Sequence, residues 1–448
     1  MTNYSKRVRS TILVVMVLCF YSAIAQIGAR FPSEKKIIKD TLTGTELTFL
    51  TSESKGDSKI YPTHNQWTSD GEWVIFRSHR VEGEAMAVNE KTGEIVQVTE
   101  GGYMGMLTVA RKSMKLYFMR QVPQSKSVQI VEVDLDKVFK DSFEGKLKLA
   151  NAYQKVSGLI PEALGAGGDM ALDANEQWVW FRVGREAALK HLNKDVVIEK
   201  DFGPRGMGAG PGGIAGMKLS TGEIKHVISV PFQVGHIQSN PWVSGQIIFC
   251  WETGGKSPQR TWIVNSDGSG LRPLYPESKY EWVTHEAVIT PNEVAFAIMG
   301  HRQIPESSIT VQASTGAYGA NLGQQREWGP SGTREKPTGL GIVNINTRAM
   351  SIIGQTPSGS GLWHVHGSPD GRFAVGDDFS RSIYLINRET KEMVLLSAGH
   401  KQTAADHPHP TFSPDGTKIV IQSAMLSKDG KNLNICIIPV PEKWLTVD

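Results

Sequence analysis

One pattern recurs along the chain: a short apolar strand, a tight polar turn and a second apolar strand. The clearest copies are WTSDGEWVIF around Asp70, GSPDGRFAVG around Asp370 and FSPDGTKIVI around Asp415, and weaker ones lie near Lys112, Asn175, Gly245 and Asn292. A second hairpin follows each copy, for example VNEKTGEIVQVT from Val88. Two hairpins give four strands, which is one blade of a β-propeller. Seven copies without long amphipathic segments predict an all-β, seven-bladed β-propeller.

The ends of the repeat array predict how the ring closes. The last copy lacks an outer strand after Asn434 to Val440, and the unmatched segment from Asp40 to Thr51 (DTLTGTELTFLT) can supply it. We therefore expect one propeller domain over residues 26–448, closed by an N-terminal strand in the last blade. Two glycine-rich stretches, 203–216 and 304–337, are interpreted as inserted loops.

The first 25 residues are typical of a secretory signal peptide. Lys6, Arg7 and Arg9 precede an apolar run from Ile12 to Tyr21, and Ala23-Ile24-Ala25 resembles a cleavage site. The run is too short to span a bilayer, and no later stretch approaches the roughly 20 apolar residues needed. We expect a periplasmic or secreted protein without a membrane span. Removing these three basic residues leaves 45 Lys+Arg against 45 Asp+Glu, which gives no indication of nucleic-acid binding.

The histidines follow the repeat. His64, His364 and His409 each stand six residues before a turn aspartate, His285 stands seven before Asn292, and His236 precedes Gly245 by a similar distance. Because the first strand of every propeller blade lines the central channel, residues at one register converge on the axis. Five repeats therefore offer a histidine near the same end of the channel.

Two further spacings refine this expectation. His407 with His409, and His364 with His366, are separated by two residues, so each pair can share one strand face. Metal ligation is the favoured interpretation for His285, His407 and His409, whereas structural and functional roles stay equally open for His64 and His366. Imidazole suits several divalent transition metals, so the sequence does not choose among manganese, zinc, iron and nickel.

Several motifs resemble one known family. VGHIQSNPWVSGQIIFCWETGG from Val234, EWVTHE ending at Glu286, and HPHPTFSPDG from His407 are similar to the oligogalacturonate lyases of polysaccharide lyase family 22. The resemblance implies a seven-bladed propeller that holds a divalent metal, typically manganese, through three histidines and a glutamine. It carries the ligands to His285, His407 and His409, and it places His236 and His364 near the substrate.

Two positions depart from that family. The glutamine expected three residues before His407 is Ala404 here, and Gln402 is out of register. The family's arginine base lies upstream of the G-H motif, where only Arg205 is close. Because arginine is normally always protonated, His236 is the easier base on physical grounds, and both His236 and Arg205 remain candidates. His364 and Arg182 are the candidate substrate contacts.

The resemblance implies a lyase that cleaves uronate-containing oligosaccharides by metal-assisted β-elimination, leaving a 4,5-unsaturated uronate. Two alternatives remain open. One is a lyase for another uronate, such as glucuronate in ulvan or plant glycans. The other is a non-catalytic periplasmic propeller that binds a protein partner, which would require no metal.

Overall fold

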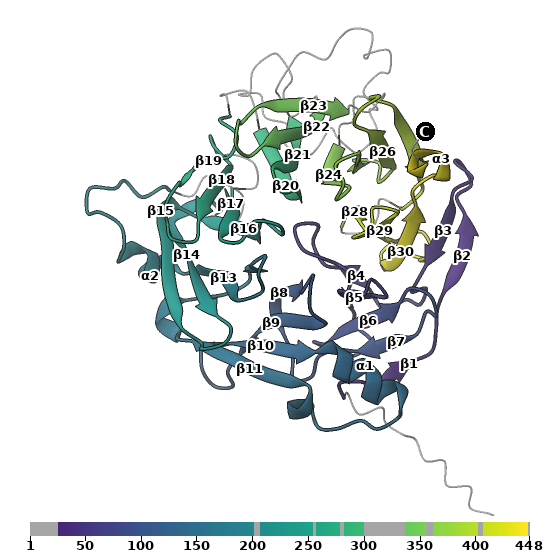
Figure 1. The fold of residues 1–448 in the computed structure, drawn as a ribbon, viewed down its shortest axis with the longest axis horizontal. Coiled ribbons are helices and arrows are strands. Elements are labelled where there is room, and N and C mark those ends of the chain that lie inside the picture. The colour runs from purple at the N-terminus through teal and green to yellow at the C-terminus, as the bar shows by residue number, and fades with distance from the viewer. Residues whose placement is uncertain are drawn as a thin grey trace, which may run out of the picture.

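The computed structural model describes residues 26–200, 207–253, 257–277, 282–299, 337–354, 362–401 and 406–446. Within these ranges, seven antiparallel sheets stand around a ring (Figure 1). This arrangement confirms the predicted all-β, seven-bladed β-propeller. The expected signal peptide, residues 1–25, lies outside the described residues.

In each of the first three sheets, the strands follow one another from the axis outward. They contain β4 (Ser58–Lys59), β5 (Trp73–Arg77), β6 (Ala85–Asn89), β7 (Ile95–Gln97) and β1 (Arg30–Phe31); then β8 (Met104–Val109), β9 (Lys115–Gln121), β10 (Val128–Asp134) and β11 (Gln154–Ile160); then β12 (Met170–Leu172), β13 (Trp178–Val183), β14 (Ala209–Lys218) and β15 (Ile224–Phe232).

The remaining four sheets follow the same order. They contain β16 (Val234–Ser239), β17 (Gln246–Trp251), β18 (Thr261–Asn265) and β19 (Arg272–Pro273); then β20 (Trp282–Thr290), β21 (Glu293–Met299), β22 (Pro337–Asn344) and β23 (Met350–Gly354); then β24 (Leu362–Gly367), β25 (Phe373–Asp378), β26 (Ile383–Asn387) and β27 (Met393–Ser397); then β28 (Thr411–Phe412), β29 (Lys418–Ser423), β30 (Asn434–Pro439), β3 (Glu46–Phe49) and β2 (Lys36–Lys39).

Helices are few and short. They are α1 (Leu135–Phe143), α2 (Arg185–Leu189) and α3 (Glu442–Leu445), with 3-10 turns η1 (Ala150–Ala152) and η2 (Glu162–Leu164). Asp134 caps α1 by accepting a hydrogen bond from the Lys137 backbone N–H, and the helix buries Leu135 and Val138 against the first two blades. Among the described residues, the helices are too short and polar to cross a bilayer.

Apolar side chains fill the space between neighbouring blades. Phe49, Phe373 and Ile421 belong to one buried cluster between the last two sheets. Val74 and Val420 belong to another, between the last sheet and the first. Each sheet is therefore apolar on both faces, because a propeller blade packs against a neighbour on either side.

The N-terminal segment completes the last blade. β3 pairs with β30 at Thr48↔Ile437 and Phe49↔Cys436, and β2 continues the sheet outward. The chain then returns to the first blade through β4, so the first and last blades are joined by the same segment (Figure 1). This is the blade in which the sequence places Asp40 to Thr51, although the segment adds two strands rather than one.

The first predicted inserted loop is wrong for most of its length. Within 203–216, residues from Ala209 onward form the ten-residue strand β14, paired on both sides. Its glycines permit close packing: a Cβ at Gly216 would lie 2.3 Å from the Trp180 ring, and one at Gly210 would lie 1.8 Å from the Pro231 carbonyl oxygen. Of the second expected loop, 304–337, only Pro337 is described, and it begins β22.

Because β3 pairs with β30 and β2 lies outside it, we expect substitutions in these two strands to have different effects on the free energy of unfolding. Phe49→Ala should reduce the free energy of unfolding by about 3–5 kcal/mol, because the ring is fully buried between blades and its removal leaves a cavity. The control Ile37→Ala removes a side chain that is 58% exposed on β2 and should change stability by less than about 0.5 kcal/mol. Chemical denaturation followed by tryptophan fluorescence measures both; equal effects would contradict a closing role for β3.

Candidate metal centre

Histidines from three neighbouring blades meet near the axis. His285 lies on β20, His364 on β24, and His407 and His409 precede β28. His364 is central: its ring centroid lies 4.1 Å from that of His285, 3.9 Å from that of His409 and 5.0 Å from that of His407. The structure thus places the three predicted metal ligands around a histidine predicted to bind substrate.

The backbone at this site is unusual. The angle φ is 49° at His236, 54° at His285 and 53° at His409, a left-handed region that costs non-glycine residues of order 1–3 kcal/mol. The strand register also shifts beside them, between Gly235 and Gln238 in β16 and between Thr284 and Ala287 in β20. Such bulges redirect a side chain away from regular alternation. Simple i, i+2 alternation therefore does not describe how these histidines reach the axis.

Asp377 on β25 lies beside three of the histidines. Its carboxylate oxygens are 3.3 Å from Nδ1 of His364 and 3.4 Å from Nδ1 of His407, and they accept the backbone N–H groups of His364 at 2.7 Å and His409 at 3.4 Å. Burial alone would raise the pKa of Asp377, but the adjacent His364, its hydrogen bond and the nearby His407 hold it well below its usual range. A wholly buried carboxylate is therefore charged.

Tyr61 occupies the position that the sequence analysis gave to a first-blade histidine. Its hydroxyl lies 2.5 Å from Nδ1 of His285, and its ring centroid lies 5.2 Å from that of His409 and 5.4 Å from that of His236. Burial raises the pKa of Tyr61, so the phenol stays protonated. No motif marked this residue, because it lies in the irregular segment after the two-residue strand β4.

His409 is held from both sides. Its Nε2 lies 3.1 Å from a carboxylate oxygen of Asp406, and its Nδ1 lies 3.4 Å from the side-chain amide nitrogen of Gln422. Gln422 also donates to the other Asp406 oxygen at 2.9 Å and to the backbone carbonyl of His407 at 2.8 Å. The H-P-H segment is thus fixed by side chains from β29 and from its own preceding residue.

These contacts fit a divalent cation. Asp377 lies beside Nδ1 of His364 and of His407, and the Tyr61 hydroxyl lies beside Nδ1 of His285. In each of these three rings, Nε2 is therefore the nitrogen available to a metal ion. In the described part of the chain, Nε2 of His285 is buried without a hydrogen-bond partner, an arrangement that costs about 1–3 kcal/mol. Burial lowers the pKa of His285 and lowers that of His364 to about 3, which keeps both rings neutral, the form that binds metals.

A second polar cluster surrounds His236. Nε2 of His236 lies 3.2 Å from Glu252, and Nδ1 lies 3.6 Å from Glu286. The buried guanidinium of Arg260 lies 3.6 Å from Glu252 and 3.4 Å from Glu286. Burial opposes charge on Arg260, but Cys250 and the two glutamates raise its pKa well above the usual value. The sequence analysis missed Arg260 and both glutamates.

This second cluster also contains a set of possible cation ligands, namely His236, Cys250 and Glu252. Arg260 already places a positive charge 3.6 Å from Glu252, which disfavours a metal ion there. Among the described residues, the other such set is His364, Asp377 and His407. The histidine cluster around His364 is therefore the candidate metal centre.

Of the two arginines predicted from the sequence, Arg182 lies within the described residues. Arg182 lies on β13, and its charge acts on the partly buried Asp169, which accepts a hydrogen bond from the His236 backbone. Burial raises the pKa of Asp169 more than these contacts lower it. Arg205 lies outside the described residues, as do Gln402 and Ala404.

His64 does not join the cluster. Its Nε2 donates to the Met170 carbonyl at 2.7 Å, and its Nδ1 lies 2.7 Å from the Thr63 hydroxyl. His64 is therefore hydrogen-bonded to groups outside the His364 cluster, as expected for a structural histidine. His366 accepts the Phe412 backbone N–H at 3.4 Å and lines a hollow of about 40 Å³ beside the turns of the inner hairpins.

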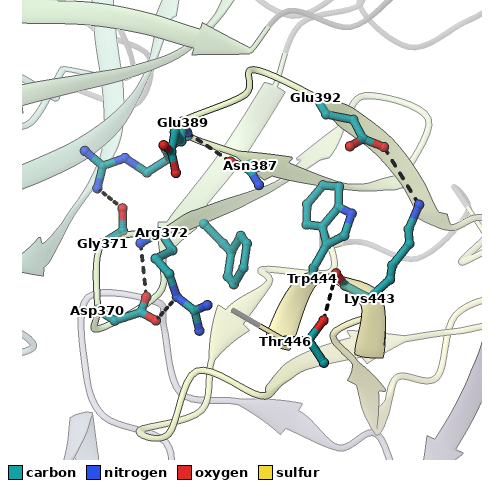
Figure 2. A pocket seen from close by; sticks show the side chains of 11 residues that line it. Asp370, Gly371, Arg372, Asn387, Glu389, Glu392, Lys443, Trp444 and Thr446 are labelled. Carbon is teal, nitrogen blue, oxygen red and sulfur yellow. Dashed lines mark hydrogen bonds and ion pairs between the residues drawn. The ribbon is translucent and has the colours of Figure 1, made fainter. Parts of the chain in front are cut away.

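A larger hollow lies elsewhere. It has a volume of about 610 Å³ and lies between the β24–β25 turn and α3, lined among others by Asp370, Arg372, Lys443 and Trp444 (Figure 2). Its charges pair with one another, as Arg372 does with Asp370 at 2.6 Å. Asp370 is six residues from His364, roughly 20 Å along an extended chain, so this hollow is separate from the metal centre.

Comparison with known proteins identifies the same architecture. No family model and no curated protein matches the chain. A solved structure described as an oligogalacturonate lyase in complex with manganese superposes with a TM-score of 0.67 at 15% identity, covering 94% of this chain and 100% of the other. An oligogalacturonate lyase from Vibrio parahaemolyticus gives 0.69 at 17% identity, covering 93% and 100%. At such identities the likeness shows the shared fold.

Buried neutral histidines predict a loss of stability in acid. Burial lowers the pKa of His64 and of His400 from 6.5 to about 4 each. Their contribution is complete above pH 6.5 and is lost as the pH falls from 6.5 toward 4, because the unfolded chain then binds more protons. The slope is at most about 1.4 kcal/mol per pH unit for each histidine.

Urea denaturation of metal-free protein at a series of pH values measures this effect. His64→Gln and His400→Gln should each flatten the dependence between about pH 4 and pH 6.5. A slope unchanged by both substitutions would show that neither histidine is responsible.

Proposed function

We propose that this chain is a lyase that cleaves uronate-containing oligosaccharides by metal-assisted β-elimination, leaving a 4,5-unsaturated uronate. The observation that carries the proposal is the cluster of buried histidines on the axis of a propeller, with Nε2 of His285 lacking a protein partner in the described region. The shared fold with two oligogalacturonate lyases supports it.

His285, His407 and His409 are the proposed ligands of a divalent cation, with manganese the metal of the similar structure. The difficulty of the reaction is that the C5 proton beside a uronate carboxylate is only weakly acidic. A divalent cation at this centre would stabilise, as a Lewis acid, the negative charge that grows on that carboxylate.

His236 is the proposed base. It would take the C5 proton, after which the O4 leaving group departs and the double bond forms between C4 and C5. Glu252 and Glu286 flank its two ring nitrogens at 3.2 and 3.6 Å, so the imidazolium that results would be stabilised by adjacent carboxylates. Arg205 stays the alternative base, and Arg182 the proposed contact for a uronate carboxylate.

The substrate screen is the direct test. Purified mature protein is incubated with oligogalacturonate, glucuronate-containing oligosaccharides and ulvan fragments, and ultraviolet absorbance of the unsaturated uronate is followed with and without chelator. We expect a chelator-sensitive rise on at least one substrate, which also names the uronate. No rise on any of them, from protein reconstituted with manganese or zinc, would favour a non-catalytic binding propeller instead.

Substitutions should separate metal binding from proton transfer. His407→Ala and His409→Ala are expected to weaken metal binding and reduce turnover by more than about 100-fold, since losing even a residue that orients a ligand costs 10–100-fold. His236→Ala should reduce kcat by about 10²–10⁴-fold while metal affinity is unchanged. The exposed His226 on β15 provides the control His226→Ala, which should behave as the parent. Metal content retained in both His407 and His409 variants would refute the ligand assignment.

A further inference from the structure

We propose that His364 is itself a metal ligand, so that the centre is a four-histidine site, and that Asp377 is the positioning residue that orients the His364 ring. The inference rests on the metal centre of the proposed function. It changes the role of His364 from a substrate contact to the fourth ligand.

Position is the first argument. Among the four histidines, His364 is the one whose ring contacts all three others, at centroid distances of 3.9 to 5.0 Å. Ligand atoms of His364, Asp377 and His407 lie within 4.8 Å of one another, and all three residues are buried. A cation bound by His285, His407 and His409 would therefore lie beside the His364 ring, and an imidazole there would ligate it or obstruct it.

Orientation is the second argument. Asp377 is wholly buried and lies within 3.4 Å of Nδ1 of both His364 and His407, while the backbone N–H of His364 fixes the carboxylate at 2.7 Å. A carboxylate that accepts N–H from one ring nitrogen leaves the other nitrogen with the lone pair and raises its basicity. The carboxylate thus prepares Nε2 of His364 for ligation, whereas it lies 3.4 Å from Nδ1 of His407 without a hydrogen bond.

The carboxylates beside the centre, Asp377 and Asp406, already accept hydrogen bonds from protein groups. Ala404 occupies the position where the resemblance implies a glutamine. Asp406 is close, but one of its oxygens lies against His409 Nε2 and accepts the His407 backbone N–H, and the other accepts from Gln422. Its side chain is half exposed, whereas His364 is buried and has no such partner on Nε2 in the described part of the structure.

Four imidazoles make a nitrogen-rich centre. Such donors suit zinc, iron, nickel or copper, whereas manganese favours carboxylate, carbonyl and water oxygen. The ligand class inferred for this chain is accordingly a borderline divalent transition metal.

The test measures the metal affinity of the centre and counts its imidazole ligands. Full-length mature protein is stripped with chelator, and the affinities for Zn²⁺ and Mn²⁺ are measured by calorimetry. X-ray absorption of the zinc-loaded protein counts the imidazoles. His364→Phe removes the proposed ligand but keeps a ring of similar size. Its matched control, His366→Phe, changes the next histidine on β24, which faces the hollow near the turns. Asp377→Asn retains the shape of the positioning residue but not its charge.

The parent should show four imidazoles. His364→Phe should show three and lose more than about 100-fold in zinc affinity, with a smaller loss for manganese. Asp377→Asn should weaken zinc binding by about 10–100-fold. His366→Phe should match the parent. Thermal unfolding of the metal-free variants checks that each folds, and if His364→Phe does not fold, the Asp377→Asn result and the imidazole count of the parent decide.

Three outcomes overturn the inference in different ways. Parent affinity and an unchanged imidazole count in His364→Phe would exclude His364 as a ligand while leaving the metal centre intact. Parent affinity in Asp377→Asn would exclude the positioning role. Failure of the parent itself to bind either metal would remove the metal centre, and the proposed function would fail with it.

Discussion

The pairing of β3 with β30 is the constraint on which the site depends. A propeller has a defined axis only when its ring is closed, and the closing strands join the first blade to the last. The seam also borders the metal centre: the Lys59 backbone N–H on β4 donates to Gln422 at 3.1 Å, and Gln422 supports the backbone of His407. Closure of the ring and the placement of the H-P-H segment are therefore parts of one hydrogen-bonded arrangement.

Buried charge is compensated locally on each side of the axis. Asp377 accepts hydrogen bonds from the ring and backbone of His364 and lies in the field of the buried Lys59, whose own pKa burial lowers well below its usual value. On the other side, Arg260 balances Glu252 and Glu286. Isolated buried charges would cost several kcal/mol each, so these pairings are a condition for placing so many polar groups in a propeller core.

The backbone conformation sets the direction of the site's side chains. Left-handed conformations at three histidines persist only because the surrounding sheets impose them, and the bulges beside His236 and His285 fix where the side chains point. The cost is met by packing between blades, where apolar residues such as Phe49 and Val420 are wholly buried. The bulges and the sheets around them thus bring four histidine rings close together at the candidate metal centre.

The sequence by itself determined the all-β class, the seven blades and the common register of the histidines, because turn chemistry and strand alternation are local properties that repeat. It misassigned residues 209–216 as a loop, since glycine content reports conformational freedom and not the close approach of Trp180. Tertiary structure alone decided that Tyr61 and not His64 joins the cluster, that His364 lies at its centre, and that Asp377 and Arg260 balance the charge. Those relations join residues from different blades through bulges and left-handed turns, and no local pattern encodes such contacts.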